Sequence, residues 1–402
     1  MADFDVVIVG AGIAGSALAA RLSGMGLDIA LVEAQPLEVP ALPAACDIDS
    51  FDPRVSALTP RSKALLEDIG AWSAIADYRL CTYSHMTVWD ADGTGVIEFD
   101  QQEVGVESLG HIVENRAIVA SLLEVLSDRK DVAQFGATTV DACERNADGT
   151  LTVALSDGQA LRASLVVAAD GAQSRLREMM AFNTREWDYG HRAVVATVQL
   201  SGSHRDTAWQ RFMPTGPLAL LPLPGAGDAH FCSIVWSLSE DRVDEIMALD
   251  DAAFCARLGR ASEHCLGDVL ATSKRYAFPL RQRHAVDYVQ PGVALVADAA
   301  HTIHPLAGQG INLGLADVAA LAEEIFEGNT RGAAPGDLAL LKRYQRQRKG
   351  ENLLMMAAMD GFKRLFEQDA LPLRWLRNTG LKGVNRLQPV KQQLMRHAMG
   401  LG

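Results

Sequence analysis

The sequence predicts an α/β fold in which one domain is assembled from separated segments and is interrupted by a β-rich insertion. Three observations lead to this prediction. An apolar run at residues 4–9 precedes a glycine-rich turn and a helix, as in the first strand of a parallel βαβ unit. Similar elements recur near residues 166–171 and 293–314. Between them, over residues 185–280, strand-like patches alternate with Gly and Pro.

Hydrophobic periodicity assigns the individual elements. Apolar runs and alternating patterns predict strands at residues 4–9, 28–33, 86–89, 96–99, 151–155, 160–168, 193–200, 230–238 and 292–297. Apolar residues at helical spacing predict helices at residues 14–25, 54–69, 115–126 and 310–326, and the pattern is helical again beyond residue 342. Residues 36–53 are rich in Pro, Ala and Asp and predict a loop.

These elements divide the chain into three parts. A discontinuous nucleotide-binding domain comprises residues 1–75, 110–182 and 276–345, a β-rich substrate domain comprises residues 76–109 and 183–275, and a helical C-terminal segment comprises residues 346–402. The length of 402 residues and the hydrophobic fraction of 49% are sufficient for two joined cores.

Charge and cysteine content exclude several functions. The net charge of −13 argues against nucleic-acid binding, so no nucleic-acid partner is expected. From Lys342 to the end, 13 Lys or Arg stand against four Asp or Glu, so this basic segment differs from the first 341 residues, which carry −22. The six cysteines form no CxxC pair, which argues against a zinc ribbon or a dithiol redox centre and favours a reducing compartment. The N-terminus lacks a basic secretory signal, and no apolar stretch approaches the about 20 residues that cross a bilayer.

The first chemical motif is Gly10-Ala11-Gly12-Ile13-Ala14-Gly15. In such a turn the first glycine permits the tight bend, the second lets a pyrophosphate approach the backbone, and the third lets helix and strand pack closely. Glu33 follows 18 residues after Gly15, where a carboxylate accepts ribose hydroxyls. The motif predicts dinucleotide binding in a Rossmann-like unit, but alone it does not distinguish FAD from NAD.

Two further motifs lie far along the chain. Asp298 ends a strand before a glycine-rich loop and a helix that begins near Gly310, so it could bind a polyol hydroxyl or simply cap the turn. Asp170-Gly171 follows another strand and by itself is typical of a turn. His301 and His304 have HxxH spacing, yet no further ligand lies at workable spacing nearby, and no metal is expected.

In this order and spacing, the three motifs resemble those of the single-component flavin-dependent aromatic hydroxylases, the p-hydroxybenzoate hydroxylase group. One position departs from that family: Ala297 stands where the motif before Asp298 has glycine. The chain is most similar to the FAD-dependent hydroxylases of ubiquinone biosynthesis, of which Phe51-Asp-Pro-Arg54, Gly110-His-Ile-Val-Glu114-Asn115, Cys232-Ser-Ile-Val-Trp236 and the run from Ala299 to Gly310 are typical. Within that family, Trp89-Asp90, Trp187-Asp-Tyr189 and the ending from Arg396 to Leu401 resemble the 2-octaprenylphenol hydroxylase branch.

The resemblance covers essentially the whole chain and implies the p-hydroxybenzoate hydroxylase fold with tightly bound, non-covalent FAD. The implied FAD-binding residues are Gly10, Gly12, Ala14, Gly15, Glu33, Arg54, Arg116, Asp170, Asp298, Gly310, Ile311 and Asn312. Ile311 and Asn312 would contact the flavin through backbone groups. His304 and Pro305 are catalytic candidates because the resemblance places them beside the flavin. The alternatives are a solvated charge at a helix start for Arg54, a surface residue for Arg116 and a structural histidine for His304.

The implied activity is hydroxylation of the aromatic ring of a polyprenylated phenol, with NAD(P)H, O₂ and a flavin C4a-hydroperoxide. Only one adenine-dinucleotide fingerprint is present, so NAD(P)H would bind transiently. A flavin dehydrogenase or quinone reductase without oxygen transfer, and a flavin-binding assembly subunit, are the alternatives.

The basic C-terminal segment has its own expectation. Apolar residues alternate with basic ones, as in an interfacial helix, at Leu371, Leu373, Arg374, Trp375, Leu376, Arg377, Leu381, Lys382, Val384, Arg386 and Leu387. This pattern indicates docking on an anionic membrane or on other ubiquinone-biosynthesis proteins, and an ordinary closing helix is the alternative. We expect a cytoplasmic protein with a peripheral position on the inner membrane.

Overall fold

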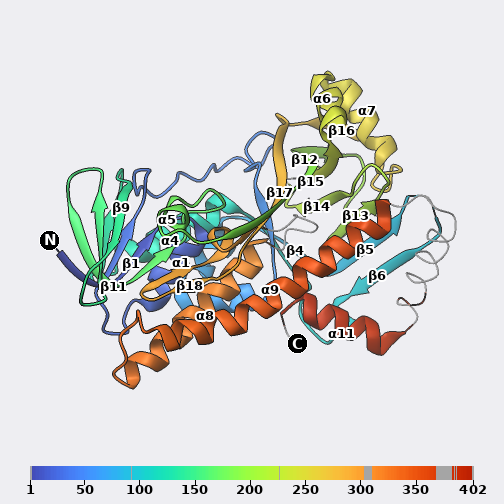
Figure 1. Cartoon of the computed structure of the whole chain (residues 1–402). Coiled ribbons are helices and arrows are strands. Elements are labelled where there is room, and N and C mark those ends of the chain that lie inside the picture. Colours follow the sequence, from blue (N-terminus) through green and yellow to red (C-terminus); the bar gives the residue numbers. More distant parts are fainter. Residues whose placement is uncertain are drawn as a thin grey trace.

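The computed structural model describes residues 2–91, 93–225, 227–302, 310–367, 383, 385 and 387–400, with the backbone alone at residues 189 and 362–367 (Figure 1). Its described part contains an eight-stranded, a nine-stranded and a three-stranded sheet. The eight-stranded sheet and its helices lie at one end of the molecule, and the nine-stranded sheet lies at the other (Figure 1). The long helix α9 (Leu338–Glu367) runs diagonally from the first end to the second (Figure 1).

The eight-stranded sheet is built around β1 (Ala2–Val9). Its main order is β18 (Val289–Gln290), β19 (Val293–Leu295), β11 (Ala160–Ala168), β1, β2 (Ile29–Val32) and β8 (Val132–Phe135). The strands β9 (Val140–Arg145) and β10 (Leu151–Leu155) extend it beside β11. Since β1 pairs in parallel with β2 on one side and β11 on the other, segments more than 100 residues apart end at one sheet edge. This strand-order switch is where parallel α/β sheets bind ligands.

Helices cover this sheet and bury its continuous apolar strands. They are α1 (Ile13–Leu22), α2 (Pro60–Ile69), α3 (Trp72–Tyr78), α4 (Asn115–Ser127), α5 (Arg175–Met179), α8 (Gly310–Thr330) and the start of α9. Val6, Val7 and Ile8 of β1 are fully buried, as expected for a central strand covered on both faces. Helix α8 packs against both α1 and α9.

The nine-stranded sheet carries the β-rich insertion. Its main order is β20 (His301–Thr302), β17 (Tyr276–Ala285), β12 (Thr184–Leu200), β15 (His230–Ser239), β14 (Leu218–Leu223), β13 (Thr207–Phe212), β5 (His85–Asp90) and β6 (Val96–Asp100), and β16 (Val269–Thr272) pairs with β12. Strand β17 belongs to this sheet, although the expected division placed residues 276–345 with the nucleotide-binding segments. The division into domains itself stays a prediction.

Two helices pack on one face of this sheet, α6 (Glu240–Ala248) and α7 (Asp251–Ala261). Neither helix was predicted, because the patches around them suggested strands throughout the insertion. Each is short and starts at a polar residue; Asp250 accepts a hydrogen bond from the Ala253 amide and caps α7.

The helix expected over residues 54–69 is wrong in its first part. Val55 to Leu58 forms β3 (Val55–Leu58), which pairs with β7 (Gly110–Glu114), and β7 in turn pairs with β4 (Cys81–Tyr83). Thr59 caps α2, and Pro60 occupies its first turn. A proline disfavours the helical conformation of the residue before it, so the helix begins only at Pro60.

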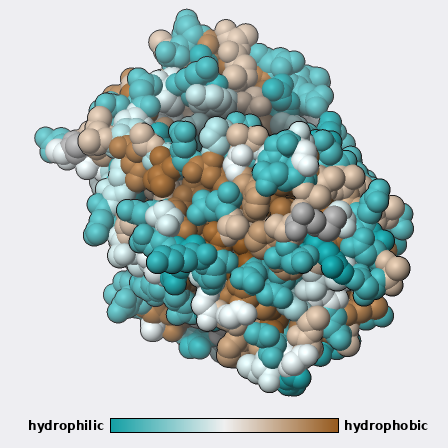
Figure 2. Space-filling model, turned by 90° about the vertical axis from the view of Figure 1, so that its left-hand side faces the viewer, coloured by the Kyte–Doolittle hydropathy of each residue, from teal (hydrophilic) through white to brown (hydrophobic). Residues whose placement is uncertain are grey.

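The other expected strands and helices in the described ranges are confirmed, although β12 begins earlier than expected and α1 ends earlier. Beyond residue 342 the helical pattern corresponds to α9 and α11 (Gln388–Ala398). None of the described helices combines the length and the apolar character needed to span a bilayer. Figure 2, which views the β9 end, shows hydrophobic residues across the middle of that face with hydrophilic residues around them.

Candidate functional site

Only glycine fits at two positions of the turn between β1 and α1. Gly10 has φ +101°, and a Cβ there would lie 2.5 Å from the Ala169 carbonyl oxygen. A Cβ at Gly15 would lie 1.8 Å from the Gly10 carbonyl oxygen. At Gly12, by contrast, a Cβ would meet nothing within 4 Å, so this glycine faces open space. The first turn of α1, with Ala14, presents amide groups that have no partner within the helix, which suits a phosphate.

Glu33 follows β2 and reaches this turn. Its Oε2 accepts a hydrogen bond from the Ala11 amide at 2.7 Å, and its Oε1 accepts one from the Gln35 amide at 3.0 Å. The carboxylate therefore lies beside the glycine turn, at the position where a dinucleotide places its adenosine ribose.

The Asp170 motif lies against the same turn. Its backbone approaches Gly10 so closely that a Cβ on Gly10 would lie 2.8 Å from the Asp170 Cα. The Asp170 Oδ2 accepts a hydrogen bond from the Leu176 amide at 3.2 Å, whereas its Oδ1 is buried without a hydrogen-bond partner among the described residues. A buried carboxylate oxygen without a partner is unfavourable, so a hydroxyl or amide donor from a bound molecule would stabilise it.

The Asp298 motif forms a short helix, η2 (Ala297–Ala299), after β19. Burial raises the pKa of the Asp298 carboxyl, while nearby His301 and Arg54 lower it. Arg177 of α5 donates hydrogen bonds to the carbonyl oxygens of Ala299 at 3.0 Å and Ala172 at 2.9 Å. Arg177 thus joins the Asp170 segment to the Asp298 segment, and it is buried.

The start of α8 is fixed by the side chain of Asn312. Its Oδ1 accepts hydrogen bonds from the Thr59 amide at 3.0 Å and the Ser62 hydroxyl at 2.7 Å, and its Nδ2 donates to the Ala57 carbonyl at 2.8 Å. The hydrogen-bonding groups of this side chain are therefore engaged by residues of β3, α2 and the turn between them. The backbone amides of Gly310, Ile311 and Asn312 lie in the first turn of α8, where amides lack intrahelical partners. Flavin contact through these amides stays a prediction.

The two arginines of the predicted site have different surroundings. Arg54 precedes β3, which rules out a position at a helix start, and its guanidinium lies 5.9 Å from the centre of the Phe278 ring. Arg116 lies in an ion cluster, where it donates to Glu114 at 2.6 Å. Arg79 donates to the other oxygen of Glu114 at 2.5 Å, and Glu114 is only 2% exposed. A role of Arg116 on the pyrophosphate stays a prediction.

Both catalytic candidates, His304 and Pro305, lie outside the described residues, as does most of the loop before α8. His301 is described and buried, and its Nε2 lies 2.5 Å from the Asp317 Oδ2.

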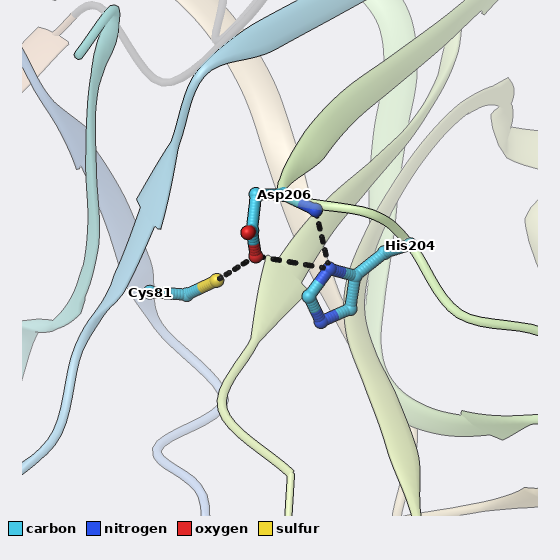
Figure 3. A group of neighbouring side chains, drawn as sticks. All are labelled: Cys81, His204 and Asp206. Atoms are coloured by element: carbon cyan, nitrogen blue, oxygen red, sulfur yellow. Dashed lines mark hydrogen bonds and ion pairs between the residues drawn. The ribbon is translucent and has the colours of Figure 1, made fainter.

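One group of potential metal ligands occurs among the described residues: Cys81, His204 and Asp206 (Figure 3). The Asp206 amide donates to His204 Nδ1 at 3.1 Å, and His204 Nε2 lies 3.0 Å from the Leu223 carbonyl oxygen, to which it donates. Burial and the neighbouring Asp206 raise the pKa of the Cys81 thiol to about 12. Because both imidazole nitrogens are engaged and the thiol is protonated, the group is explained as a hydrogen-bonded turn and we assign no metal to it.

Sequence reasoning assigned no role to four buried charges, Glu114, Arg177, Asp317 and Arg348, or to the partly buried Arg79. Asp317 carried a signal, since it is the one charged residue in the apolar run from Ile311 to Leu321. Arg348 lies in a polar, basic stretch and carried none.

The chain is similar to known proteins over nearly its whole length. The family model described as "FAD binding domain" matches residues 3–356. The chain is 36% identical over 398 residues to 3-demethoxyubiquinol 3-hydroxylase of Escherichia coli (strain K12), covering 99% of this chain and 98% of that protein. It is 37% identical over 396 residues to ubiquinone hydroxylase UbiL of Rhodospirillum rubrum, covering 98% of this chain and 89% of that protein.

The fold has solved counterparts. The structure of PqsL from Pseudomonas aeruginosa, described as a probable FAD-dependent monooxygenase, superposes with a TM-score of 0.76 at 23% identity and covers 95% of this chain and all of that chain. This confirms the expected fold class. The open face at Gly12, the carboxylate of Glu33 and the unpaired oxygen of Asp170 fit the ADP half of FAD, and the first turn of α8 fits its ring.

Proposed function

Because the chain belongs to the family of FAD-dependent hydroxylases of ubiquinone biosynthesis, we propose that it hydroxylates the aromatic ring of a polyprenylated phenol, with NAD(P)H as a transient reductant and O₂ as the oxygen source. The chain is an FAD-dependent monooxygenase, as its relatives are. Bound FAD would supply the redox chemistry between NAD(P)H and O₂, and one oxygen atom would enter the ring while the other leaves as water.

One observation carries the proposal: the Asp298 motif, which we call the flavin motif, continues directly into the second sheet. Two residues after η2, strand β20 pairs with β17, with His301 opposite His284 and Thr302 opposite Arg283. We therefore expect the ring end of the FAD site at the junction of the two large sheets. A substrate held by the second sheet would meet the flavin there, away from the ADP end.

The second sheet offers an apolar wall at this junction. The face opposite α6 and α7 carries the buried cluster Ala193, Val195, Val235 and Leu280. On β17, Tyr276 and Phe278 stack with ring centres 6.4 Å apart, and Phe278 is 37% exposed. Such a surface would bind a prenyl chain and an aromatic ring and would exclude water from the reacting atoms.

The test is an oxygen-isotope experiment with the purified holoprotein, NADH or NADPH and a defined prenylphenol under ¹⁸O₂. The proposal requires one ¹⁸O atom in the new hydroxyl group. Oxidised product without the label would instead support a dehydrogenase or quinone reductase. Failure of NAD(P)H to reduce the flavin, with or without substrate, would support an assembly subunit.

2-Octaprenylphenol is the first substrate to test, because Trp89-Asp90 and Trp187-Asp-Tyr189 resemble that branch. The relative from Escherichia coli is named for a demethoxyubiquinol, which makes this compound the second. Product analysis with both would assign the ring position. If the protein turns over neither compound, this part of the proposal is refuted.

We further propose that the C-terminal segment docks the protein on the anionic inner membrane, from the cytoplasmic side. Of the residues that form the interfacial pattern, only Leu387 lies within the described residues. Support comes from α11 and the residue before it: Leu387, Val390 and Leu394 are 56%, 44% and 49% exposed and follow one stripe. Next to this stripe, the buried Lys391 holds α11 to the body through an ion pair with Glu103 at 2.6 Å. An apolar stripe in a segment with a surplus of positive charge suits an anionic lipid surface.

Sedimentation with vesicles tests this docking. Leu394→Glu should reduce binding to vesicles of anionic lipid at least fivefold, because it places a carboxylate on the stripe. Leu270→Glu is the matched control, since Leu270 is 57% exposed on β16, and it should bind as the parent does. Equal losses in both variants, or none in either, would remove the stripe from the proposal, and retained binding to partner proteins of the pathway would then favour a protein surface.

A further inference from the structure

A single buried carboxylate receives four hydrogen bonds beneath the flavin motif. Asp317 Oδ2 accepts from the Ala297 amide at 3.0 Å and lies 2.5 Å from His301 Nε2. Asp317 Oδ1 accepts from Arg348 Nε at 2.8 Å and from Asn352 Nδ2 at 3.2 Å. Asp317, Arg348 and Asn352 are completely buried, and His301 is 1% exposed. Burial alone would raise the pKa of Asp317, but His301 and Arg348 hold it below its ordinary value, so the carboxylate is charged.

Two of these bonds act on the flavin motif itself. Ala297 directly precedes Asp298 and has φ +52°, a left-handed conformation that alanine adopts only with strain. Glycine would adopt this conformation freely. The methyl group fits because α8 has Gly314 opposite: a Cβ on Gly314 would lie 2.7 Å from the Ala297 Cβ. The bond from the Ala297 amide to Asp317 therefore holds a strained residue in place.

The other two bonds come from the long helix α9. Arg348 also donates to Asn352 Oδ1 at 3.0 Å, and Asn352 Nδ2 lies 3.3 Å from the Tyr288 hydroxyl. Tyr288 in turn bonds to His284 Nε2 at 3.1 Å, on the strand that pairs with β20. Helix α9 is thus connected with both sides of the flavin motif through buried groups whose hydrogen bonds strengthen one another.

We propose that Asp317 is a positioning residue of the FAD site, which holds Ala297 and Asp298 in the flavin-binding conformation and makes that conformation depend on the seating of α9. Among the described residues, the hydrogen-bond partners of Asp317 are Ala297, His301, Arg348 and Asn352, so its route to Asp298 runs through Ala297. Asp317 holds a residue that lacks the conformational freedom of glycine, and α9 supplies two of the four hydrogen bonds that fix Asp317.

A double-mutant cycle on the full-length protein tests the proposal. Asp317→Asn keeps the shape of the side chain but removes its charge and one acceptor. We expect the dissociation constant of FAD to rise at least tenfold and the visible circular dichroism of bound flavin to change. Adding Ala297→Gly should restore at least a third of the FAD-binding free energy that Asp317→Asn loses, because glycine needs no clamp to adopt φ +52°. Ala297→Gly alone should change FAD affinity less than twofold.

The matched control is Glu324→Gln. Glu324 also lies on α8 and pairs with Arg343 of α9 at 2.6 Å, so it joins the same two helices away from the flavin motif. Its FAD affinity should stay within twofold of the parent. Should Asp317→Asn not fold, Asn352→Ala provides the milder change on α9 and should weaken FAD binding about threefold. The proposal is overturned if these changes lower stability while FAD affinity and the flavin spectrum stay unchanged, or if Ala297→Gly restores nothing.

Discussion

We expect glycine at residue 12 to be required for FAD binding but not for folding. Gly10 and Gly15 are required by the folded chain, since a Cβ at either would collide with backbone at 2.5 Å or less. Gly12 has φ −67° and ψ −174°, which any residue adopts, and a Cβ there meets nothing. Only a bound pyrophosphate would contact the added methyl group of Gly12→Ala.

The two effects of Gly12→Ala therefore have opposite signs. In the protein without FAD, alanine restricts the unfolded chain and should raise the free energy of unfolding by about 0.4–1 kcal/mol. With FAD, the methyl group displaces the pyrophosphate from the amides of the first turn of α1. Loss of one such charged hydrogen bond is worth about 1.5–3 kcal/mol, so the dissociation constant of FAD should rise at least about tenfold.

Guanidinium unfolding of the FAD-free protein measures the first effect, and titration of flavin fluorescence measures the second. Gly350→Ala is the matched control, because a Cβ at Gly350 also meets nothing and the residue lies within α9, far along the chain from the glycine turn. It should stabilise the protein without weakening FAD binding. If Gly12→Ala binds FAD as tightly as the parent, the pyrophosphate does not lie at this glycine and the assignment of the ADP half is refuted.

Three further predictions follow from individual side chains. Glu33→Gln should weaken FAD binding about tenfold in a fluorescence titration, because a charged acceptor for the ribose becomes neutral; an unchanged affinity would separate Glu33 from the ribose. Asn312→Leu leaves the buried Thr59 amide without its acceptor and should lower the free energy of unfolding by about 2–3 kcal/mol, and a loss below about 0.5 kcal/mol would contradict the role assigned to this side chain. Burial lowers the pKa of His111 and His284 to about 4 from 6.5, so the unfolded chain binds protons at higher pH than the folded chain, and stability is lost as the pH falls from 6.5 towards 4. From pH 7 to pH 5, the free energy of unfolding should fall by about 2 kcal/mol per histidine, measured by guanidinium unfolding with saturating FAD. His284→Gln should remove about half of this total pH-dependent loss. A free energy of unfolding that does not change with pH would show that these histidines are not buried and neutral.

The sequence could predict the three FAD segments because each carries its chemistry locally. A strand, a glycine turn and a helix follow one another within 25 residues at the N-terminus, and the requirement for glycine at residues 10 and 15 comes from contacts within that unit and its neighbouring strand. Their meeting at one sheet edge follows from parallel strand order, which the resemblance implied and the pairing of β1 with β11 realises.

Short elements were harder to predict because tertiary pairing decides them. Residues 55–58 have apolar residues that also fit a helical period, and only pairing with β7 makes them a strand. The proline at residue 60 was the available signal for the boundary. The helices α6 and α7 carry buried apolar residues at helical spacing, such as Val243 and Ile246, but both are short and lie among strand-like patches.

The buried ion clusters were beyond sequence reasoning for a different reason. Asp317 and Arg348 lie 31 residues apart on two helices, and Glu114 and Arg79 lie 35 residues apart. Periodicity predicts which face of a helix is buried, but the partner of a charge depends on how two helices cross. Ala297 was recognised as a departure from the family, yet its left-handed backbone and its bond to Asp317 became evident only in the structure.

The central claim is that three segments, near residues 10–33, 170 and 298–312, hold one FAD molecule with its ring at the junction of the two large sheets. A crystal structure of the FAD-bound protein tests it most directly. We predict the ribose on Glu33, the pyrophosphate at Gly12 and the first turn of α1, a hydroxyl or amide donor on Asp170 Oδ1, and the ring against the first turn of α8. An FAD molecule whose ring lies away from residues 298–312, or whose pyrophosphate does not contact the glycine turn, would contradict the account.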